Sequence, residues 1–131
     1  MATVLKFEDL EVWQLGRELY QKVGTLIDKN AFKNNYRLIG QSEGSSGSVI
    51  DNIAEGFERG TRAEFIMFLG YAKGSCGELR SQLYRILDRN YIVQEVFEEL
   101  HSLTMRISSM LQKLIMYLQK TTIKGTRAYK P

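Results

Sequence analysis

Apolar residues recur every three or four positions along almost the whole chain, and no proline interrupts this pattern. The single proline is the last of the 131 residues, so every earlier position keeps the backbone donor that helical hydrogen bonds require. A recurrence of three and four places apolar side chains on one face of an α-helix. The sequence therefore predicts an all-α fold.

The same spacing divides the chain into four segments. We predict helices at about Glu8–Lys29, Asn35–Glu58, Thr61–Arg89 and, after a break at Asn90–Ile92, as far as Lys120. Short connections favour an antiparallel up-down-up-down four-helix bundle. We expect residues 1–120 to form this bundle. Residues 121–131 show no periodicity and are expected to form a flexible basic tail.

The predicted core takes one apolar face from each helix. For the first two helices the inward residues are Val12, Leu15, Leu19, Val23 and Leu26, then Ile39, Ser46, Ile50, Ile53 and Phe57. For the third they are Phe65, Leu69, Ala72, Cys76, Leu79, Leu83 and Ile86. For the fourth they are Val96, Leu100, Leu103, Ile107, Met110, Leu114 and Tyr117. The spacings of the fourth helix alternate between four and three, a heptad pattern that suits helix packing at about 20°.

The boundary between the second and third helices has the clearest signals. Gly60 can adopt the left-handed conformation that ends a helix. Thr61 can cap the next helix, and Glu64, three residues later, completes a capping box.

The cysteine and histidine content excludes several kinds of site within one chain. One cysteine permits no internal disulfide, and one histidine permits no two-histidine metal site. Cys76 falls on the inward face of its helix, and His101 falls on an outer face, where we interpret it as a solvated residue. No combination of serine, histidine and acid has a spacing typical of a catalytic triad. We expect a protein that is not an enzyme and has no cofactor or metal.

The cellular location is predicted from the same composition. The first residues lack the basic start and apolar run of a signal peptide. No stretch approaches the length of uncharged apolar sequence that spans a membrane. With one cysteine as well, a cytoplasmic location without membrane contact is expected.

Residues 65–72, FIMFLGYA, are apolar on every side of the third helix. Ile66, Met67 and Tyr71 point away from the face that contains Phe65. A helix in a monomeric bundle normally has one apolar face. Scattered surface apolar residues would explain the run, but burial against another subunit explains it better, and we predict a homo-oligomer.

Glycines are concentrated inside the predicted helices, where each one costs about 0.5–1 kcal/mol relative to alanine. Gly40, Gly44 and Gly47 have the same spacing as Gly70, Gly74 and Gly77. Either the second and third helices approach closely at these glycines, or the glycines present a smooth groove to a neighbouring subunit. The alternative is that the glycines are tolerated without a role, which their summed cost disfavours.

Basic residues are unevenly distributed. Residues 1–99 carry 12 basic and 15 acidic side chains, whereas residues 100–131 carry six basic side chains and no acid. Such a basic end can attract a polyanion, although it can also serve solubility. The candidate nucleic-acid-binding residues are Arg62, Lys73, Arg80, Arg85, Arg89, Arg106, Lys113, Lys120, Lys124 and Arg127. Arg62, Lys73 and Arg80 share one helical face.

A polar group also lies around the turn between the second and third helices. Ser48, Asn52, Glu55 and Arg59 fall on one face of the second helix, with Glu64 beside them and Glu78 further along the third. One interpretation is a hydrogen-bonded seam that fixes the helix register. The other is an anion-binding surface formed by Arg59 and Arg62 at a helix start.

At these residues the sequence resembles the four-helix proteins encoded in bacterial 23S rRNA intervening sequences. The resemblance covers roughly residues 7–118 and is strongest in NIAEGFERGTRAEFIMFLGYAKGSCGEL. The residues that match the family motif are Asn52, Ala54, Glu55, Gly56, Arg59, Glu64, Phe65, Leu69, Ala72, Gly74, Ser75, Glu78 and Leu79.

The resemblance implies an antiparallel four-helix bundle that assembles into a ring, typically a homopentamer. It also implies a fold similar to the accessory proteins of diversity-generating retroelements, which bind nucleic acid and a reverse transcriptase. The chain departs from the family where it reads SEGSSG after Gln41, because relatives commonly have a basic, alanine-rich segment there. Relatives also commonly have a proline in the stretch before Asn52, and Val49–Asp51 contains none.

Together these observations predict a non-enzymatic oligomeric bundle that binds structured RNA, or other nucleic acid, through phosphate contacts. The alternative is a protein-interaction scaffold whose apolar and glycine faces serve self-assembly or bind a partner protein.

Overall fold

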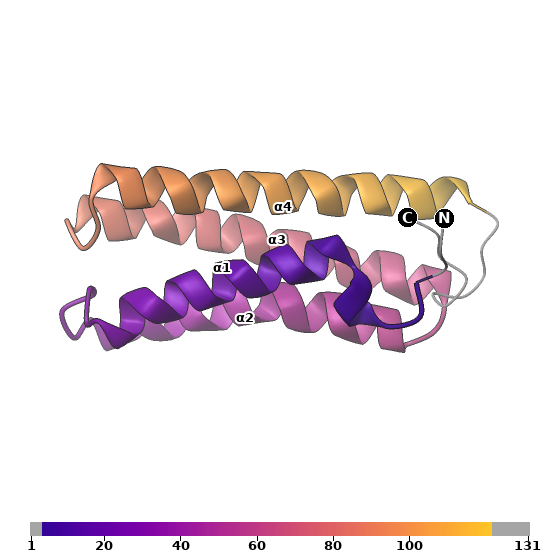
Figure 1. Ribbon diagram of the computed structural model, residues 1–131, viewed down its shortest axis with the longest axis horizontal. Coiled ribbons are helices and arrows are strands. Elements are labelled where there is room, and N and C mark those ends of the chain that lie inside the picture. The colour runs from indigo at the N-terminus through magenta and orange to yellow at the C-terminus, as the bar shows by residue number, and fades with distance from the viewer. Residues whose placement is uncertain (1–3, 122–131) are drawn as a thin grey trace.

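The computed structural model describes residues 4–121, which form four α-helices lying lengthwise beside one another (Figure 1). A short 3₁₀ helix, η1 (Phe7–Asp9), precedes α1 (Glu11–Asp28), and α2 (Tyr36–Glu58), α3 (Arg62–Asp88) and α4 (Gln94–Lys120) follow. No strand occurs among the described residues. The all-α prediction is confirmed, and the four helices pack as a bundle. The predicted tail residues 122–131 lie outside the described part of the chain.

The first helix begins later than the sequence predicts. Residues 7–9 form η1, and Leu10 has an extended backbone with φ −75° and ψ 123°. The α-helix therefore starts at Glu11 rather than near Glu8. Leu10 is buried, so this break brings an additional apolar side chain into the core.

The α2–α3 connection has the predicted geometry. Gly60 has φ +88°, a conformation that favours glycine. The backbone N–H of Glu64 donates to Thr61 Oγ1 at 3.2 Å, and Thr61 Oγ1 donates to Glu64 Oε1 at 2.9 Å. The predicted Thr61 cap is confirmed. The Glu64 carboxylate returns to the Thr61 hydroxyl, whereas in a capping box it accepts from the backbone N–H of the capping residue. Asn35 caps α2 in the same manner, with its Oδ1 accepting from Leu38 N–H at 3.2 Å.

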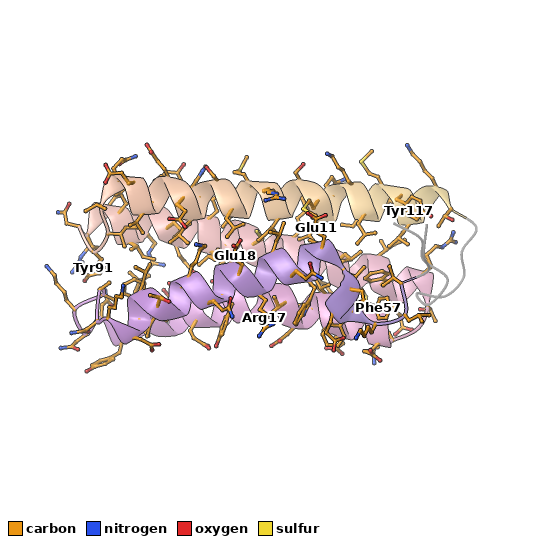
Figure 2. The ribbon with its side chains drawn as sticks, viewed as in Figure 1. Glu11, Arg17, Glu18, Phe57, Tyr91 and Tyr117 are labelled. Atoms are coloured by element: carbon orange, nitrogen blue, oxygen red, sulfur yellow. The ribbon has the colours of Figure 1, made fainter. Side chains whose placement is uncertain are left out.

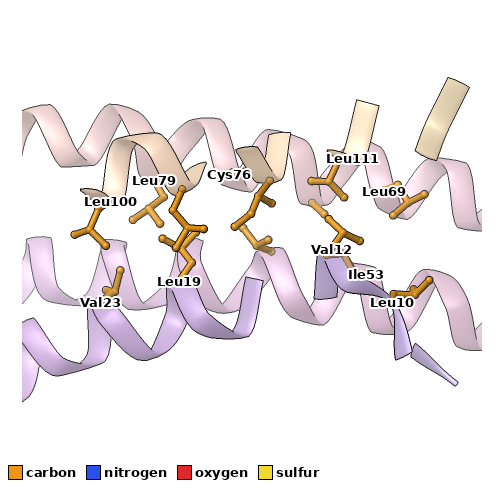
Figure 3. Packing of buried hydrophobic residues seen from close by; sticks show 14 of the residues in the cluster. Leu10, Val12, Leu19, Val23, Ile53, Leu69, Cys76, Leu79, Leu100 and Leu111 are labelled. Atoms are coloured by element: carbon orange, nitrogen blue, oxygen red, sulfur yellow. The ribbon is translucent and has the colours of Figure 1, made fainter. Parts of the chain in front are cut away.

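The core lies between the four helices, and α3 contributes to it as predicted. Figure 3 shows side chains from all four helices meeting in the interior, among them Leu19, Ile53, Leu79 and Leu111. All seven residues predicted to face inward from α3 are buried: Phe65, Leu69, Ala72, Cys76, Leu79, Leu83 and Ile86.

The inward face of α4 differs from the prediction near both ends. The predicted Val96 is half-buried, whereas the next residue, Phe97, is buried. Tyr117 is 41% exposed, whereas Leu111 and Leu118 are buried. Met110 is half-buried. Apolar residues form two adjacent rows on α4, one containing Met110 and Tyr117 and the other containing Leu111 and Leu118. Packing against the neighbouring helices buries the second row. A heptad pattern cannot choose between two such rows.

Smaller differences of the same kind occur in α1 and α2. Leu15, Leu26, Ile39 and Ile50 are half-buried rather than central in the core. The predicted Ser46, Ile53 and Phe57 are buried, and they are joined on the buried face of α2 by Leu38, Ser42, Ser45 and Val49.

The glycines do not bring α2 and α3 together in the way that their spacing suggested. A Cβ placed on Gly40, Gly44, Gly70, Gly74 or Gly77 meets no atom within 4 Å. The close-approach interpretation is therefore wrong for these positions. The close contacts occur at two other glycines: a Cβ on Gly16 would lie 2.7 Å from Ile50 Cγ2, and one on Gly56 would lie 2.6 Å from Phe68 Cβ.

The all-round apolar segment of α3 presents two large side chains to solvent in the single chain. Met67 is 41% exposed and Tyr71 is 53% exposed. Ile66 is half-buried, and Phe68 packs edge-on against Tyr71 with ring centroids 5.5 Å apart. Gly70 and Gly74, on the same helix, are also exposed.

Candidate nucleic-acid interface

Three basic side chains of α3 form a row directed toward α4. Arg62 donates through Nη1 to the carbonyl of Thr121. Lys73 Nζ donates to Gln112 Oε1 at 2.6 Å, and Arg80 Nη1 contacts Met105 Sδ at 3.2 Å. The three side chains thus follow one side of α3, as predicted. We call Arg62, Lys73 and Arg80 the cation row.

The charges of the cation row are not neutralised by ion pairs. Each of the three contacts described above is to a neutral group on α4 or at Thr121, the residue that follows it. Across residues 4–121, carboxylates form ion pairs with Lys22, Arg59 and Arg106 and with no member of the row. Positive charges without acidic partners create a field that attracts an anionic ligand.

The remaining candidate cations of α3 lie off this row. Arg85 Nη1 donates to Gln41 Oε1 on α2 at 3.1 Å. The Arg89 guanidinium lies 5.8 Å from the ring centre of Tyr91. Figure 2 shows Tyr91 at one end of the bundle, with Phe57 and Tyr117 toward the other. Arg85 therefore contacts α2 rather than α4, and Arg89 lies beside Tyr91 just after the end of α3.

Two candidate cations of α4, Arg106 and Lys113, lie near the N-terminal part of the chain, and Lys120 lies at the C-terminal end of α4. Arg106 Nη2 lies 3.4 Å from Glu11 Oε1, so its charge is partly compensated. Lys113 lines an apolar pocket of about 480 Å³ together with Leu10 and Val12. Lys120 is exposed in the last turn of α4, where it complements the helix dipole. Lys124 and Arg127 lie outside the described residues.

The polar group at the α2–α3 turn has hydrogen bonds that account for several of its members. Asn52 Nδ2 donates to the Ser48 carbonyl at 2.8 Å. Arg59 Nε lies 2.9 Å from Glu64 Oε2, and its guanidinium lies 5.4 Å from the ring centre of Phe68. The Arg59–Glu64 pair joins the end of α2 to the first turn of α3 and favours the register-fixing interpretation, because an anion at Arg59 would compete with the Glu64 carboxylate.

Two members of that group have other surroundings. Glu55 is exposed. Glu78 lines a shallow groove of about 320 Å³ between α2 and α3 with Gly40, Gly44 and Arg85. The structure therefore does not bring Glu78 together with Arg59 and Glu64.

A buried hydrogen bond joins α2 to α3 and was not predicted from the sequence. Ser45 Oγ donates to Gln82 Oε1 at 2.6 Å, and Gln82 is only 5% exposed. Ser46 Oγ donates to the Ser42 carbonyl at 2.7 Å. The available signal was the spacing of Ser42, Ser45 and Ser46, which places all three on the apolar face of one helix.

An aromatic cluster on α3 and α4 was also missed. Tyr84 packs edge-on against Phe97, with ring centroids 5.0 Å apart, and against His101 at 5.7 Å. Tyr84 Oη lies 3.3 Å from His101 Nε2. His101 is half-buried and its contact with Tyr84 lies at the surface, so it occupies an outer face as predicted but is partly covered by an aromatic partner. The helical position of His101 alone could not reveal the neighbouring Tyr84.

Cys76 is a core residue whose thiol has a raised pKa. Its Sγ donates to the Thr104 carbonyl at 3.2 Å, and burial raises the pKa of the thiol from 9.0 to about 11.

Within residues 4–121, no group of three or more histidine, cysteine or acidic side chains is arranged to hold a metal ion. None of the described helices is long and apolar enough to cross a membrane.

Comparisons with known proteins agree with this architecture. A crystal structure of a protein of unknown function from the S23 ribosomal protein family of Bacteroides thetaiotaomicron superposes with a TM-score of 0.72 and 24% sequence identity. The match covers 84% of this chain and 99% of that one, and it establishes likeness of fold. Curated protein sequences give no significant match. The profile of the family described as 23S rRNA-intervening sequence protein matches residues 8–113. This chain therefore belongs to the 23S rRNA-intervening sequence protein family.

Proposed function

We propose that this protein is a non-enzymatic, cytoplasmic homo-oligomer that binds structured RNA or other nucleic acid through phosphate contacts. The observation that carries the proposal is the cation row. Arg62, Lys73 and Arg80 project along one side of α3 and contact only neutral groups among the described residues. At about 1.5 Å per residue, they span about 27 Å of the helix. A row of this length suits several consecutive phosphates better than a single small anion.

The proposed topology is the antiparallel up-down-up-down bundle. Two hydrogen bonds support this arrangement for α2 and α3, because Gln41 pairs with Arg85 and the later Ser45 pairs with the earlier Gln82. For α3 and α4, Lys73 pairs with Gln112 and the later Arg80 pairs with the earlier Met105. In both cases the partner number falls as the residue number rises.

The proposed assembly is a ring, with a pentamer favoured by family resemblance. The surface that supports it includes the exposed Met67 and Tyr71 and the open glycines Gly70 and Gly74. Glycines with space above them allow another helix to approach closely, and the two large apolar side chains would supply area to bury. A ring would repeat the cation row around its wall, which would multiply the number of phosphate contacts.

The family description supplies the first candidate ligand. Because the family is named for an intervening sequence of 23S rRNA, folded rRNA fragments are the first nucleic acids to test. RNA helices and loops both present phosphates, so contacts of this kind need no particular base sequence.

The test is a titration of labelled rRNA fragments by fluorescence anisotropy, beginning at about 50 mM salt. We expect binding that weakens as salt rises. The triple variant Arg62→Gln, Lys73→Gln and Arg80→Gln should reduce the salt slope by about two to three, since each neutralised phosphate contributes about 0.7–0.9.

A matched control removes three exposed cations elsewhere. Lys29, Lys33 and Arg37 lie between and at the ends of α1 and α2, and all three are exposed. Their replacement by glutamine changes the net charge equally and should leave the slope nearly unchanged. Absence of binding by the wild-type protein at about 50 mM salt would contradict the proposal.

The second candidate function is a protein-interaction scaffold. It is favoured by the exposed Met67 and Tyr71, because a binding partner could cover them in place of another copy of the chain. Weak, salt-insensitive binding of RNA, together with stoichiometric co-purification of one protein, would support this function over the first.

A further inference from the structure

The aromatic cluster lies at one end of the cation row. Tyr84 follows Arg80 by four residues, which is about 6 Å along α3. Arg80 contacts Met105 on α4, and Tyr84 contacts His101, one turn earlier on α4. The row and the cluster therefore occupy the same side of α3 and the same seam with α4.

The ring of Tyr84 is both held in place and accessible. It packs against Phe97, which is only 7% exposed, and its hydroxyl lies 3.3 Å from His101 Nε2. The residue itself is 49% exposed. An aromatic ring already fixed by its neighbours loses little conformational freedom when a ligand binds to it.

A phosphate-binding row beside such a ring has the chemistry of a site for an unpaired nucleotide. Every nucleobase has an aromatic face that can stack on a tyrosine or histidine ring, and unpaired bases are free to do so. Bases inside a duplex are already stacked on one another. A row of cations alone would not distinguish these two states of RNA.

We propose that Tyr84, supported by His101 and Phe97, is a base-stacking subsite for an unpaired nucleotide of RNA. The proposal rests on the proposed function, since Arg80 would hold the neighbouring phosphate. It adds that the protein recognises single-stranded segments, such as loops of a folded RNA, and not only phosphate charge.

The test compares two probes, an unstructured oligouridine and a blunt RNA duplex of the same strand length, by fluorescence anisotropy at about 50 mM salt. The variant Tyr84→Leu keeps an apolar side chain against Phe97 and removes the aromatic face. We expect its affinity for oligouridine to fall about tenfold and its affinity for the duplex to change less than about twofold. Tyr84→Phe should retain the oligouridine affinity within about twofold.

A matched control is Tyr36→Leu, because Tyr36 is 74% exposed at the start of α2, away from the seam between α3 and α4. It should bind both probes as the wild type does. Circular dichroism of each variant checks that the helices are intact.

The outcomes separate the two proposals. An equal loss for both probes in Tyr84→Leu, no loss for oligouridine, or a wild-type protein that binds duplex alone would overturn the stacking subsite and leave the proposed function standing. A wild-type protein that binds neither probe, nor the rRNA fragments, would overturn both. A loss for oligouridine in Tyr36→Leu as large as that in Tyr84→Leu would also overturn the subsite.

Discussion

Gly56 of α2 lies directly against Phe68 of α3, because a Cβ at Gly56 would stand 2.6 Å from Phe68 Cβ and 3.3 Å from Phe65 Cδ1. The absence of a side chain at this position is what permits α2 and α3 to approach near their connecting turn. The glycine that sets the contact was not among the six glycines whose repeated spacing first suggested close packing.

Replacement of Gly56 by alanine should destabilise the fold. The new methyl group would overlap Phe68, and overpacking of this kind costs about 1–3 kcal/mol in the free energy of unfolding. The control is Gly24→Ala, where a Cβ meets nothing within 4 Å. There the better helix propensity of alanine should raise the stability by about 0.5–1 kcal/mol. Urea denaturation measures both, and a stabilised Gly56→Ala would refute the close contact.

Thr61→Ala should lower the free energy of unfolding by about 1 kcal/mol, because the Glu64 N–H loses its capping acceptor. The matched control is Thr25→Ala. Thr25 Oγ1 only donates to the Gln21 carbonyl within α1, so its loss should be nearly neutral. Thermal denaturation followed by circular dichroism would show the difference, and equal melting temperatures for the two variants would contradict the cap assignment.

Ser45→Ala should lower the free energy of unfolding by about 1–3 kcal/mol, because the buried side-chain Oε1 of Gln82 would lose its donor. Adding Gln82→Met to Ser45→Ala should recover much of this loss, since both polar groups are then absent. The interaction energy from the double-mutant cycle is the relevant quantity. Additive effects of the two substitutions would argue against a direct bond between these side chains.

The Cys76 thiol should contribute a pH-dependent part of the stability. Burial raises its pKa from 9.0 to about 11 in the folded protein. The folded state thus holds the thiol proton more tightly than the unfolded state does. The resulting stabilisation is complete below about pH 9 and is lost as the pH rises toward about 11. The stability advantage of the wild type over Cys76→Ala should shrink across this window.

Chemical labelling provides an independent check on the same thiol. Iodoacetamide reacts with the thiolate, so at about pH 8 Cys76 should react slowly in the native protein and rapidly in urea. Equally fast labelling in both conditions would show that the thiol is accessible and its pKa ordinary.

Gly74→Leu tests the proposed assembly surface. A Cβ at Gly74 meets nothing within 4 Å, so the single chain should tolerate leucine without loss of helicity. If another copy packs there, the side chain should shift the mass measured by light scattering toward the monomer. Gly24→Leu on α1 serves as the control and should leave the mass unchanged. An unaltered oligomer in Gly74→Leu would exclude this surface from the interface.

Local signals in the sequence were sufficient for much of the fold. The end of α2 at Gly60 and the cap at Thr61 are determined by residues within one turn, and all seven predicted inward residues of α3 are buried. The error at Tyr117 has a different origin. Tyr117 and Leu118 follow Leu114 by three and four residues, so both spacings fit one helical face. Only the position of the other helices decides which of the two side chains faces the core.

The candidate site was predictable where it depends on one helix and not where it depends on two. The shared face of Arg62, Lys73 and Arg80 follows from their spacing alone. The contact of Tyr84 with His101 joins residues 17 positions apart on different helices. The ion pair of Arg106 with Glu11 joins residues 95 positions apart, and it weakens Arg106 as a candidate phosphate contact.

The spacing of the cation row determines how a nucleic-acid strand bound along it would be oriented relative to the bundle axis. Arg62 and Arg80 are 18 residues apart, and at about 3.6 residues per turn this separation is about five complete turns. The two side chains therefore have nearly the same azimuth on α3. A purely heptad spacing would instead rotate by about 20° with each repeat. A strand that follows the row would run parallel to the long axis of the bundle rather than winding around it, so each copy in an assembly would present its own straight track.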